Sequence, residues 1–145
     1  MKLLFLITFL SNLNYSFFAQ NTIDVVSGEY EVTYNSSNSL IVDKLTLNPD
    51  GTFVFHEYDK HDNGVPPERN KYGKGTWHVE KNIISFTTSK ADFDEKYTLD
   101  FNTSTARFIT KLPRDNSNRD IKTSLKFFNS QIPWMTGRTL LKIKN

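Results

Sequence analysis

The sequence predicts an all-β protein, a single antiparallel up-and-down β-barrel of about eight short strands, with a β-sandwich as the alternative. Apolar residues recur at every second position along most of the chain, which is the period of a strand with one buried face. Turn-forming residues separate these runs at nearly regular spacing. Because a local hairpin can join each consecutive pair of strands, the up-and-down barrel is favoured over the sandwich.

The first nineteen residues have the composition of a secretory signal peptide. Lys2 precedes an apolar run at residues 3–10, and the small residue Ala19 follows a short polar stretch. The run is well short of the roughly 20 residues that a membrane span needs. We therefore expect export, with cleavage after residue 19 and one domain at residues 20–145. The expected location is the periplasm or the outside of the cell, with no membrane span.

The chain contains no cysteine, which excludes both a disulfide framework and a lipoprotein anchor. Its charge is unevenly distributed: residues 20–104 carry eight basic and fourteen acidic side chains, whereas residues 105–145 carry nine basic and two acidic ones. In a closed sheet the first and last strands are neighbours, so we expect these charges to complement one another. An anion-binding face is the alternative. The net charge of the whole domain is near zero, which, together with the expected export, argues against nucleic acid as a partner.

The first three strands are the clearest. Residues 28–34 alternate, and residues 40–47 form a second strand that ends in the turn Asn48-Pro49-Asp50-Gly51. Pro presets φ at the second position of such a turn, and Gly accepts positive φ at the fourth. The chain returns as a third strand at residues 52–58. The second and third strands therefore form a hairpin.

The middle of the chain begins with a polar segment at residues 59–72, which has no periodicity and is expected to be a long loop. Strands follow at residues 75–79 and 83–88, joined by a short turn. Two more alternating runs, at residues 96–101 and 105–112, are expected to pair through Asn102-Thr103-Ser104.

The last third contains a polar loop at residues 113–120 and a cleanly alternating strand at residues 121–127. The segment at residues 128–137 follows, and a final strand is expected at residues 139–143. We expect no helix, because the apolar period stays close to two. The apolar cluster Ile132-Pro133-Trp134-Met135 is the only one outside the expected strands.

Three short motifs resemble the lipocalin-like domains of small exported bacterial proteins. Ser27-Gly28-Glu29-Tyr30 is similar to the Gly-x-Trp or Gly-x-Tyr that opens the first strand of that family. Residues 45–53, Leu-Thr-Leu-Asn-Pro-Asp-Gly-Thr-Phe, are similar to its L-x-L-x-x-D-G-T-F hairpin. Gly75-Thr76-Trp77, with Asn82 and Ile84, is similar to its later G-x-W strand and the return.

The resemblance covers roughly the first half of the domain and implies an eight-stranded barrel with a small-molecule cavity. In lipocalins an Arg from the end of the chain packs across a Trp of the first strand. The corresponding residues here are Arg138, just before the last strand, and Tyr30 in place of the Trp.

Metal and catalytic motifs are weak. The segment from His56 to His61 is one residue longer than H-E-x-x-H, and its two histidines would face opposite sides of a strand. Residues 59–64 resemble the start of a calcium loop, but Asn70 stands where the bidentate Glu is needed. There is no cysteine and no Gly-x-Ser-x-Gly elbow, and the acids at residues 92–95 are expected to be loop residues. We expect no metal site, no cofactor and no catalytic activity.

Binding is the function class that the sequence favours. Tyr58, Arg69 and Tyr72 flank the polar segment at residues 59–72 and are candidates to line the barrel mouth, although an ordinary polar loop is the simpler interpretation. Trp134 is expected to plug one end of the barrel, or alternatively to anchor a partner protein. These four residues are the predicted binding residues.

The predicted function is therefore that of an exported, monomeric, non-catalytic binding module that carries a small apolar ligand. The inward-facing residues are mostly large, however, so the barrel could instead be filled and binding confined to its surface. The alternative function is a protein–protein module, such as a β-barrel inhibitor of an extracellular hydrolase. The segment expected to insert into such a target is the free one at residues 20–26, or a loop.

Overall fold

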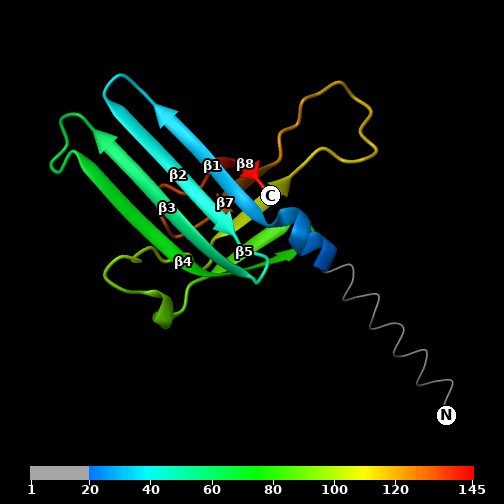
Figure 1. Ribbon diagram of the computed structural model, residues 1–145, viewed down its shortest axis with the longest axis horizontal. Coiled ribbons are helices and arrows are strands. Elements are labelled where there is room, and N and C mark those ends of the chain that lie inside the picture. Colours follow the sequence, from blue (N-terminus) through cyan, green and yellow to red (C-terminus); the bar gives the residue numbers. More distant parts are fainter. Residues whose placement is uncertain (1–19) are drawn as a thin grey trace, which may run out of the picture.

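Within residues 20–145, which the structure describes, eight β-strands close into one antiparallel barrel in the order β1 to β8 (Figure 1). The structure is a computed structural model, and the predicted signal peptide at residues 1–19 lies outside the described residues. The strands are β1 (Gly28–Asn35), β2 (Ser39–Leu47), β3 (Thr52–His61), β4 (Glu68–Glu80), β5 (Ile83–Thr87), β6 (Thr105–Ile109), β7 (Ser124–Asn129) and β8 (Thr139–Lys144). The predicted up-and-down barrel is confirmed, and the sandwich is excluded.

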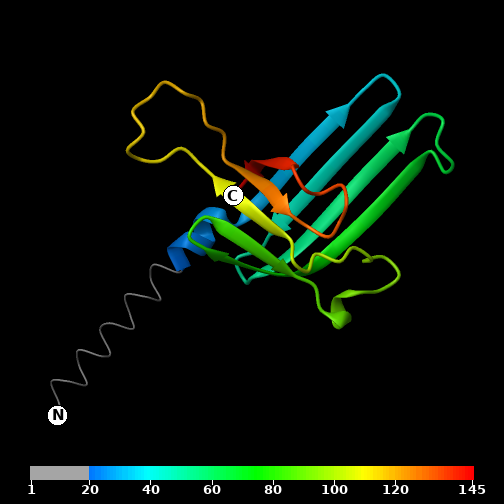
Figure 2. The same ribbon diagram turned by 180° about the vertical axis from the view of Figure 1, so that it is seen from behind.

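The two halves of the barrel differ in length. Strands β1 to β4 have eight to thirteen residues, whereas β5 to β8 have five or six. The hairpin tips at residues 36–38 and 62–67 therefore project beyond the short strands (Figures 1 and 2). We call this end of the barrel the open end. It leaves part of the inner face of β1 to β4 without a strand opposite it.

Aromatic side chains fill the middle of the barrel. Neighbouring ring centroids lie 5.1–5.9 Å apart in a cluster of buried phenylalanines. Its members are Phe53, Phe55, Phe86, Phe101 and Phe127. The inner face of β4 accommodates this cluster with glycine, because a Cβ at Gly73 would lie 2.5 Å from the Phe101 ring. The filled interior anticipated from the large inward-facing residues is therefore present.

A short helix at residues 20–26 packs against the end of the barrel opposite the open end, which we call the closed end. The sequence predicted no helix. Val26 is buried, and its carbonyl accepts a 2.5 Å hydrogen bond from the Tyr30 hydroxyl. Lys142 Nζ donates to the carbonyl of Val25 over 2.8 Å. The expectation of a free segment at residues 20–26 is therefore wrong. Two turns are too short for a helical period to be visible in the sequence. Among the described residues, no helix is long and apolar enough to span a membrane.

The predicted long loop at residues 59–72 is wrong, because strands occupy most of it. β3 continues through His61 and β4 begins at Glu68, so only residues 62–67 form the loop. Opposite charges replace apolar alternation along these strands, since Asp59 lies opposite Arg69. Cross-strand pairs of this kind stabilise a sheet without giving the alternation of hydrophobic residues that sequence analysis depends on.

The predicted strand at residues 96–101 is also wrong. Tyr97 makes one isolated parallel bridge with Tyr72, and the amides of Thr98 and Leu99 both donate to the Tyr72 carbonyl. The short 3-10 helix η1 (Lys90–Asp92) and the Asp94 side chain, which accepts bonds from two following amides, turn the chain away from the sheet. β5 therefore pairs directly with β6. The alternation at residues 96–101 reflects the burial of Phe101 rather than strand pairing.

The last strands are displaced or shorter than predicted. The strand expected at residues 105–112 ends at Ile109, and the one expected at 121–127 is found at Ser124–Asn129. β8 pairs with β1, as closure requires, and Lys144 forms an ion pair with Glu29 at 3.6 Å. The expected charge complementarity between the two ends of the chain is present at this seam.

Phe101 should be a main determinant of stability. We expect Phe101→Ala to lower the free energy of unfolding by about 3–5 kcal/mol, because it opens a cavity inside the phenylalanine cluster. Phe93→Ala, on the exposed side of the same connection, should change it by less than about 1 kcal/mol. Urea denaturation of both variants checks this, and equal losses would contradict the described packing.

Candidate functional site

The inner face of β1 to β4 changes from apolar to charged toward the open end. Residues directly opposite one another form cross-strand rows on this face. The apolar row contains Tyr30, Leu45, Phe55 and Gly73. The first charged row contains Val32, Asp43, Glu57 and Lys71, and the second contains Tyr34, Ile41, Asp59 and Arg69. We call these two rows, together with Arg138, the charged inner face.

Arg138 is the centre of this face. It precedes β8, and its Nη1 donates to Asp43 Oδ2 and, over 3.0 Å, to Glu57 Oε2. Its guanidinium lies 4.4 Å from the ring centroid of Trp134 and 5.5 Å from that of Tyr34. The side chain therefore ties the segment before β8 to β2 and β3 through charge-assisted hydrogen bonds and ring contacts.

The residue pair that the lipocalin resemblance implies is not found. Arg138 stacks on Trp134 and Tyr34, whereas the cation nearest the Tyr30 ring is Lys142, whose Nζ lies 5.9 Å from its centroid. The phenol of Tyr30 instead holds the N-terminal helix through the Val26 carbonyl. Arg138 thus makes its contacts toward the open end of the barrel.

Two of the carboxylates are buried. Asp43 has no exposed surface and Glu57 is 2 % exposed. Burial raises the pKa of Asp43 to about 6, Arg138 acts in the opposite direction, and the neighbouring Glu57 carboxylate adds to the rise. Glu57 also accepts a 2.6 Å hydrogen bond from Lys71 Nζ. Among the described residues, Asp43 Oδ1 has no hydrogen-bond partner.

The second charged row lies nearer to solvent. Asp59 Oδ1 is 2.9 Å from His61 Nε2, and Asp59 Oδ2 is 4.0 Å from Arg69 Nε. The Arg69 side chain is 52 % exposed and that of Lys71 35 %, while the carboxylates lie beneath them. A molecule that approaches the open end therefore meets N–H donors, together with the exposed ring of Tyr34.

Of the four predicted binding residues, one belongs to this face and a second adjoins it. Arg69 lies in the second charged row. Trp134 is half-buried between Phe55, at 6.0 Å between ring centroids, and the cations Arg138 and Lys71. This position is that of a plug between the aromatic interior and the open end.

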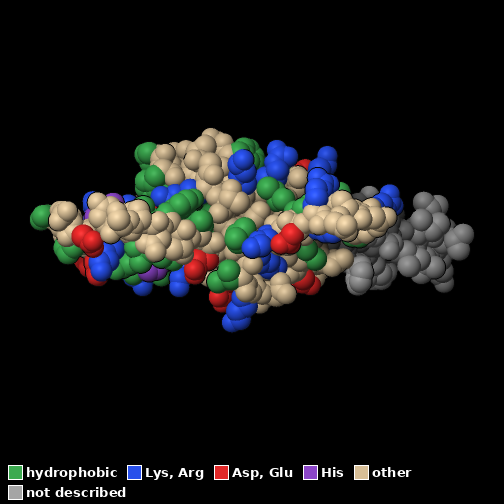
Figure 3. All heavy atoms as spheres, turned by 90° about the horizontal axis from the view of Figure 1, so that it is seen from above, with side chains coloured by type: hydrophobic (Ala, Val, Ile, Leu, Met, Phe, Trp, Pro, Cys, Tyr) green, Lys and Arg blue, Asp and Glu red, His purple; other side chains and the backbone are tan. Residues whose placement is uncertain are grey.

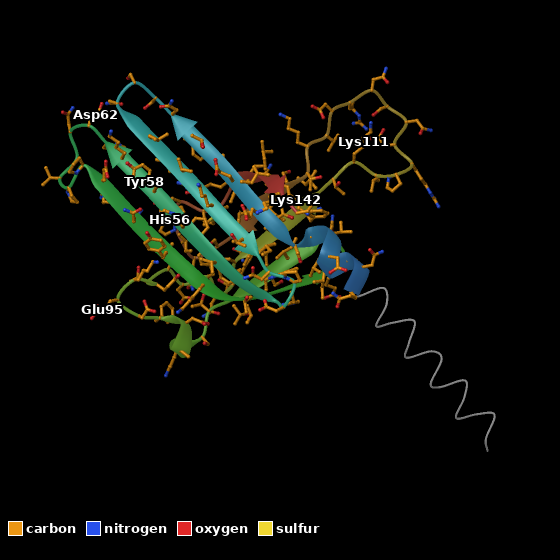
Figure 4. The ribbon with its side chains drawn as sticks, viewed as in Figure 1. His56, Tyr58, Asp62, Glu95, Lys111 and Lys142 are labelled. Carbon is orange, nitrogen blue, oxygen red and sulfur yellow. The ribbon has the colours of Figure 1, made fainter. Side chains whose placement is uncertain are left out.

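Tyr58 and Tyr72 lie on the opposite, outward face of β3 and β4. The Tyr72 ring stacks on His56 at 4.5 Å, and His56 Nε2 lies 2.8 Å from Asn70 Oδ1. Figure 4 shows His56 and Tyr58 together on β3. Burial and the Glu68 carboxylate raise the pKa of Tyr58. The sheet separates these tyrosines from Arg69 and Trp134, so the four residues do not line one mouth. A binding role for each remains a prediction.

Asp43, Glu57 and Lys71 form a group that was not predicted from the sequence. Asp43 points to the same face of its strand as Leu45 and Leu47, and Glu57 points to the same face of its strand as Phe55. A charged residue at an inward position is the signal that could have identified them. Their mutual contact could not be predicted, because it depends on the register between three strands.

His56 and His61, whose segment was compared with H-E-x-x-H, lie on opposite faces of β3, as the strand period requires. No group of three or more His, Cys, Asp or Glu side chains within residues 20–145 is arranged to hold a metal ion. One hollow, of about 370 Å³, lies between the N-terminal helix and the end of β4, where Trp77 and Val79 line it.

Comparisons with protein-family models, with curated proteins and with solved structures gave no match. The closed eight-stranded antiparallel barrel is consistent with a lipocalin-like fold. The site is therefore defined by this chain's own residues.

Removal of Arg138 should destabilise the protein strongly. We expect Arg138→Met to lower the free energy of unfolding by about 3–5 kcal/mol, because it leaves two buried carboxylates without their shared cation. Arg119→Met, which breaks an ion pair on an exposed loop, should cost less than about 1 kcal/mol. Adding Asp43→Asn and Glu57→Gln to Arg138→Met should recover most of the loss in urea denaturation. A loss that persists in the triple variant would contradict this explanation.

The pH dependence of stability should show the raised pKa of Asp43. The folded chain binds this proton up to about pH 6, whereas the ordinary value is 3.8. The contribution of Asp43 to the free energy of unfolding is therefore complete below the pKa of the unfolded chain and is lost as the pH rises through the pKa of the folded chain. Since each pKa unit corresponds to about 1.4 kcal/mol, wild type should lose about 3 kcal/mol relative to Asp43→Asn between about pH 4 and about pH 7.

Asp115→Asn provides the control of opposite sign for this titration. Hydrogen bonds from Ser117 hold the pKa of Asp115 below its usual value. Its contribution is therefore lost as pH falls. Urea denaturation at a series of pH values measures both differences, and a wild-type minus Asp43→Asn difference that is flat with pH would contradict the burial of this carboxyl.

Proposed function

We propose that this protein is an exported, monomeric, non-catalytic binding module that holds a small ligand on the charged inner face at the open end of the barrel. The observation that carries the proposal is the change from a packed aromatic interior to two rows of charged residues on a face that no strand covers. Export rests on the predicted signal peptide, and the lipocalin-like architecture supports a binding role.

Buried charges argue for function rather than stability. Removing charged groups from water costs several kcal/mol per ion, and well-packed apolar residues often stabilise a core as well or better. The rows directly below are filled with leucine and phenylalanine, so the fold tolerates apolar residues on this face. We infer that Asp43, Glu57 and Arg138 are retained because they organise a binding surface.

The ligand sits above Trp134 rather than inside the barrel, because the phenylalanine cluster fills the interior. Arg69 and Lys71 present N–H donors, and the rings of Tyr34 and Trp134 offer flat apolar surface. This combination suits a small molecule with an anionic or acceptor-rich group attached to a ring or another apolar part. It replaces the wholly apolar ligand that the sequence suggested.

An interaction with an extracellular protein is the second candidate. The tip of the β3–β4 hairpin carries Val65-Pro66-Pro67, and Val65 is 97 % exposed. An apolar residue as exposed as this one on a projecting tip is available for contact with a partner protein. The N-terminal segment that was expected to insert is packed against the barrel, so this tip is the element that an inhibitor would use.

Native mass spectrometry of the protein purified from its host tests the proposal. We expect a bound small molecule that dissociates on mild denaturation, and we expect the double variant Arg69→Ala, Lys71→Ala to lose it. The matched control, Lys60→Ala with Lys74→Ala, removes two cations from the outward face of the same strands and should retain the ligand. A ligand-free wild type, or equal retention by both double variants, would contradict the site.

A further inference from the structure

The outward face of β6, β7 and β8 is basic and partly apolar. We call it the basic outer face and define it by Arg107, Lys126, Phe128, Leu141 and Ile143. The three strands contain no acidic residue. Phe128, Leu141 and Ile143 are 46 %, 39 % and 58 % exposed, respectively. Lys and Arg side chains gather along the upper edge of the view in Figure 3, where acidic side chains are few.

Two cations of this face occupy directly opposite positions on neighbouring strands. Arg107 on β6 is directly opposite Lys126 on β7. Like charges at such cross-strand positions destabilise a sheet. Among the described residues neither side chain forms an ion pair, and the guanidinium of Arg107 lies 5.8 Å from the ring centroid of Phe128. The local charge is therefore not neutralised within the molecule, in contrast to the seam between β1 and β8.

More cations surround the apolar part of this face. A hollow of about 500 Å³ is lined by Leu141 and Ile143 together with Lys122, Lys142 and Lys144. Figure 4 shows Lys142 beside the N-terminal helix, where Nζ donates to Val25. Lys144 pairs with Glu29 at 3.6 Å, and for Lys122 no ion pair is formed among the described residues. Lys122 and Lys144 thus lie beside Leu141 and Ile143 in this hollow, whereas the Nζ of Lys142 is held at the N-terminal helix.

We propose that the basic outer face docks the protein on an anionic lipid membrane surface. Phe128, Leu141 and Ile143 would enter the interfacial region, and Arg107, Lys122 and Lys126 would contact lipid phosphates. This proposal is independent of the ligand site at the open end. An anion-binding face was the alternative to charge complementarity in the interpretation of the uneven charge distribution, and a membrane-docking face is of this kind.

The distribution of residues favours a membrane over a protein partner. A stable protein interface takes about 20–30 residues from each side and has an apolar core. The basic outer face offers three apolar side chains, of which Leu141 and Ile143 line one hollow, and these do not form such a core. A membrane surface requires no fixed shape from the protein, because headgroups rearrange around the cations, and a few apolar contacts combine with charge attraction.

Co-sedimentation with lipid vesicles tests the proposal with the whole protein. We expect binding to vesicles of phosphatidylglycerol and phosphatidylcholine in equal parts, weak binding to phosphatidylcholine alone, and loss of binding as salt rises. The key variant is Lys126→Glu, which replaces a like-charge pair with an opposite-charge pair and so preserves the fold. It should weaken binding by roughly tenfold or more, since each cation beside an anionic surface contributes about fivefold.

Two further variants separate the contributions. The double variant Leu141→Ser, Ile143→Ser should weaken binding without changing the charge. The control, Lys60→Glu with Lys74→Glu, changes the outward face of β3 and β4 instead. It should weaken binding less than Lys126→Glu does. Equal binding to both vesicle compositions, equal losses for Lys126→Glu and the Lys60/Lys74 control, or no binding would overturn the proposal. Concentration-dependent dimerisation that Leu141→Ser with Ile143→Ser abolishes would assign this face to a second copy instead and would also overturn it.

Discussion

The open end of the barrel depends on the contact of one guanidinium with two buried carboxylates. Arg138 comes from the segment before the last strand, whereas Asp43 and Glu57 lie opposite one another on β2 and β3. The bridge therefore joins the end of the chain to its first half across the top of the aromatic interior. Trp134 is held beneath the same guanidinium, so the plug and the charged rows form one unit.

The charged rows remain accessible to solvent because β5 to β8 are shorter than β1 to β4. If β5 to β8 were as long as β1 to β4, the barrel would continue upward and its charged rows would face other strands. Instead the connections at residues 88–104 and 130–138 end the short half below the hairpin tips. Phe101 and Trp134, on these two connections, occupy the centre. The molecule is thus a filled barrel whose charged inner face lies above its aromatic core.

Alternation of apolar residues was sufficient to predict the barrel and the hairpin at Asn48 to Gly51, but it indicated nine strands where eight form within residues 20–145. Alternation failed where strand pairing depends on other interactions. The open ends of β3 and β4 pair through opposite charges, without alternating apolar residues. Residues 96–101 alternate because Phe101 is buried, but they form no strand, since the amides of Thr98 and Leu99 donate to the carbonyl of Tyr72. Arg69 and Trp134 were predicted from the sequence as binding residues, a role that is still a prediction. Their neighbours Asp43, Glu57 and Lys71 were not, because cross-strand register cannot be read from one strand at a time.

The most direct test of the charged inner face is an NMR titration of the aspartate side-chain carboxyl carbons. One resonance, absent in Asp43→Asn, should titrate near pH 6. It should move to still higher pH in Arg138→Met, because the cation that favours the charged form has been removed. If the Asp43 resonance titrates near the ordinary value of 3.8 and does not respond to Arg138→Met, the buried carboxylate bridge does not exist as described.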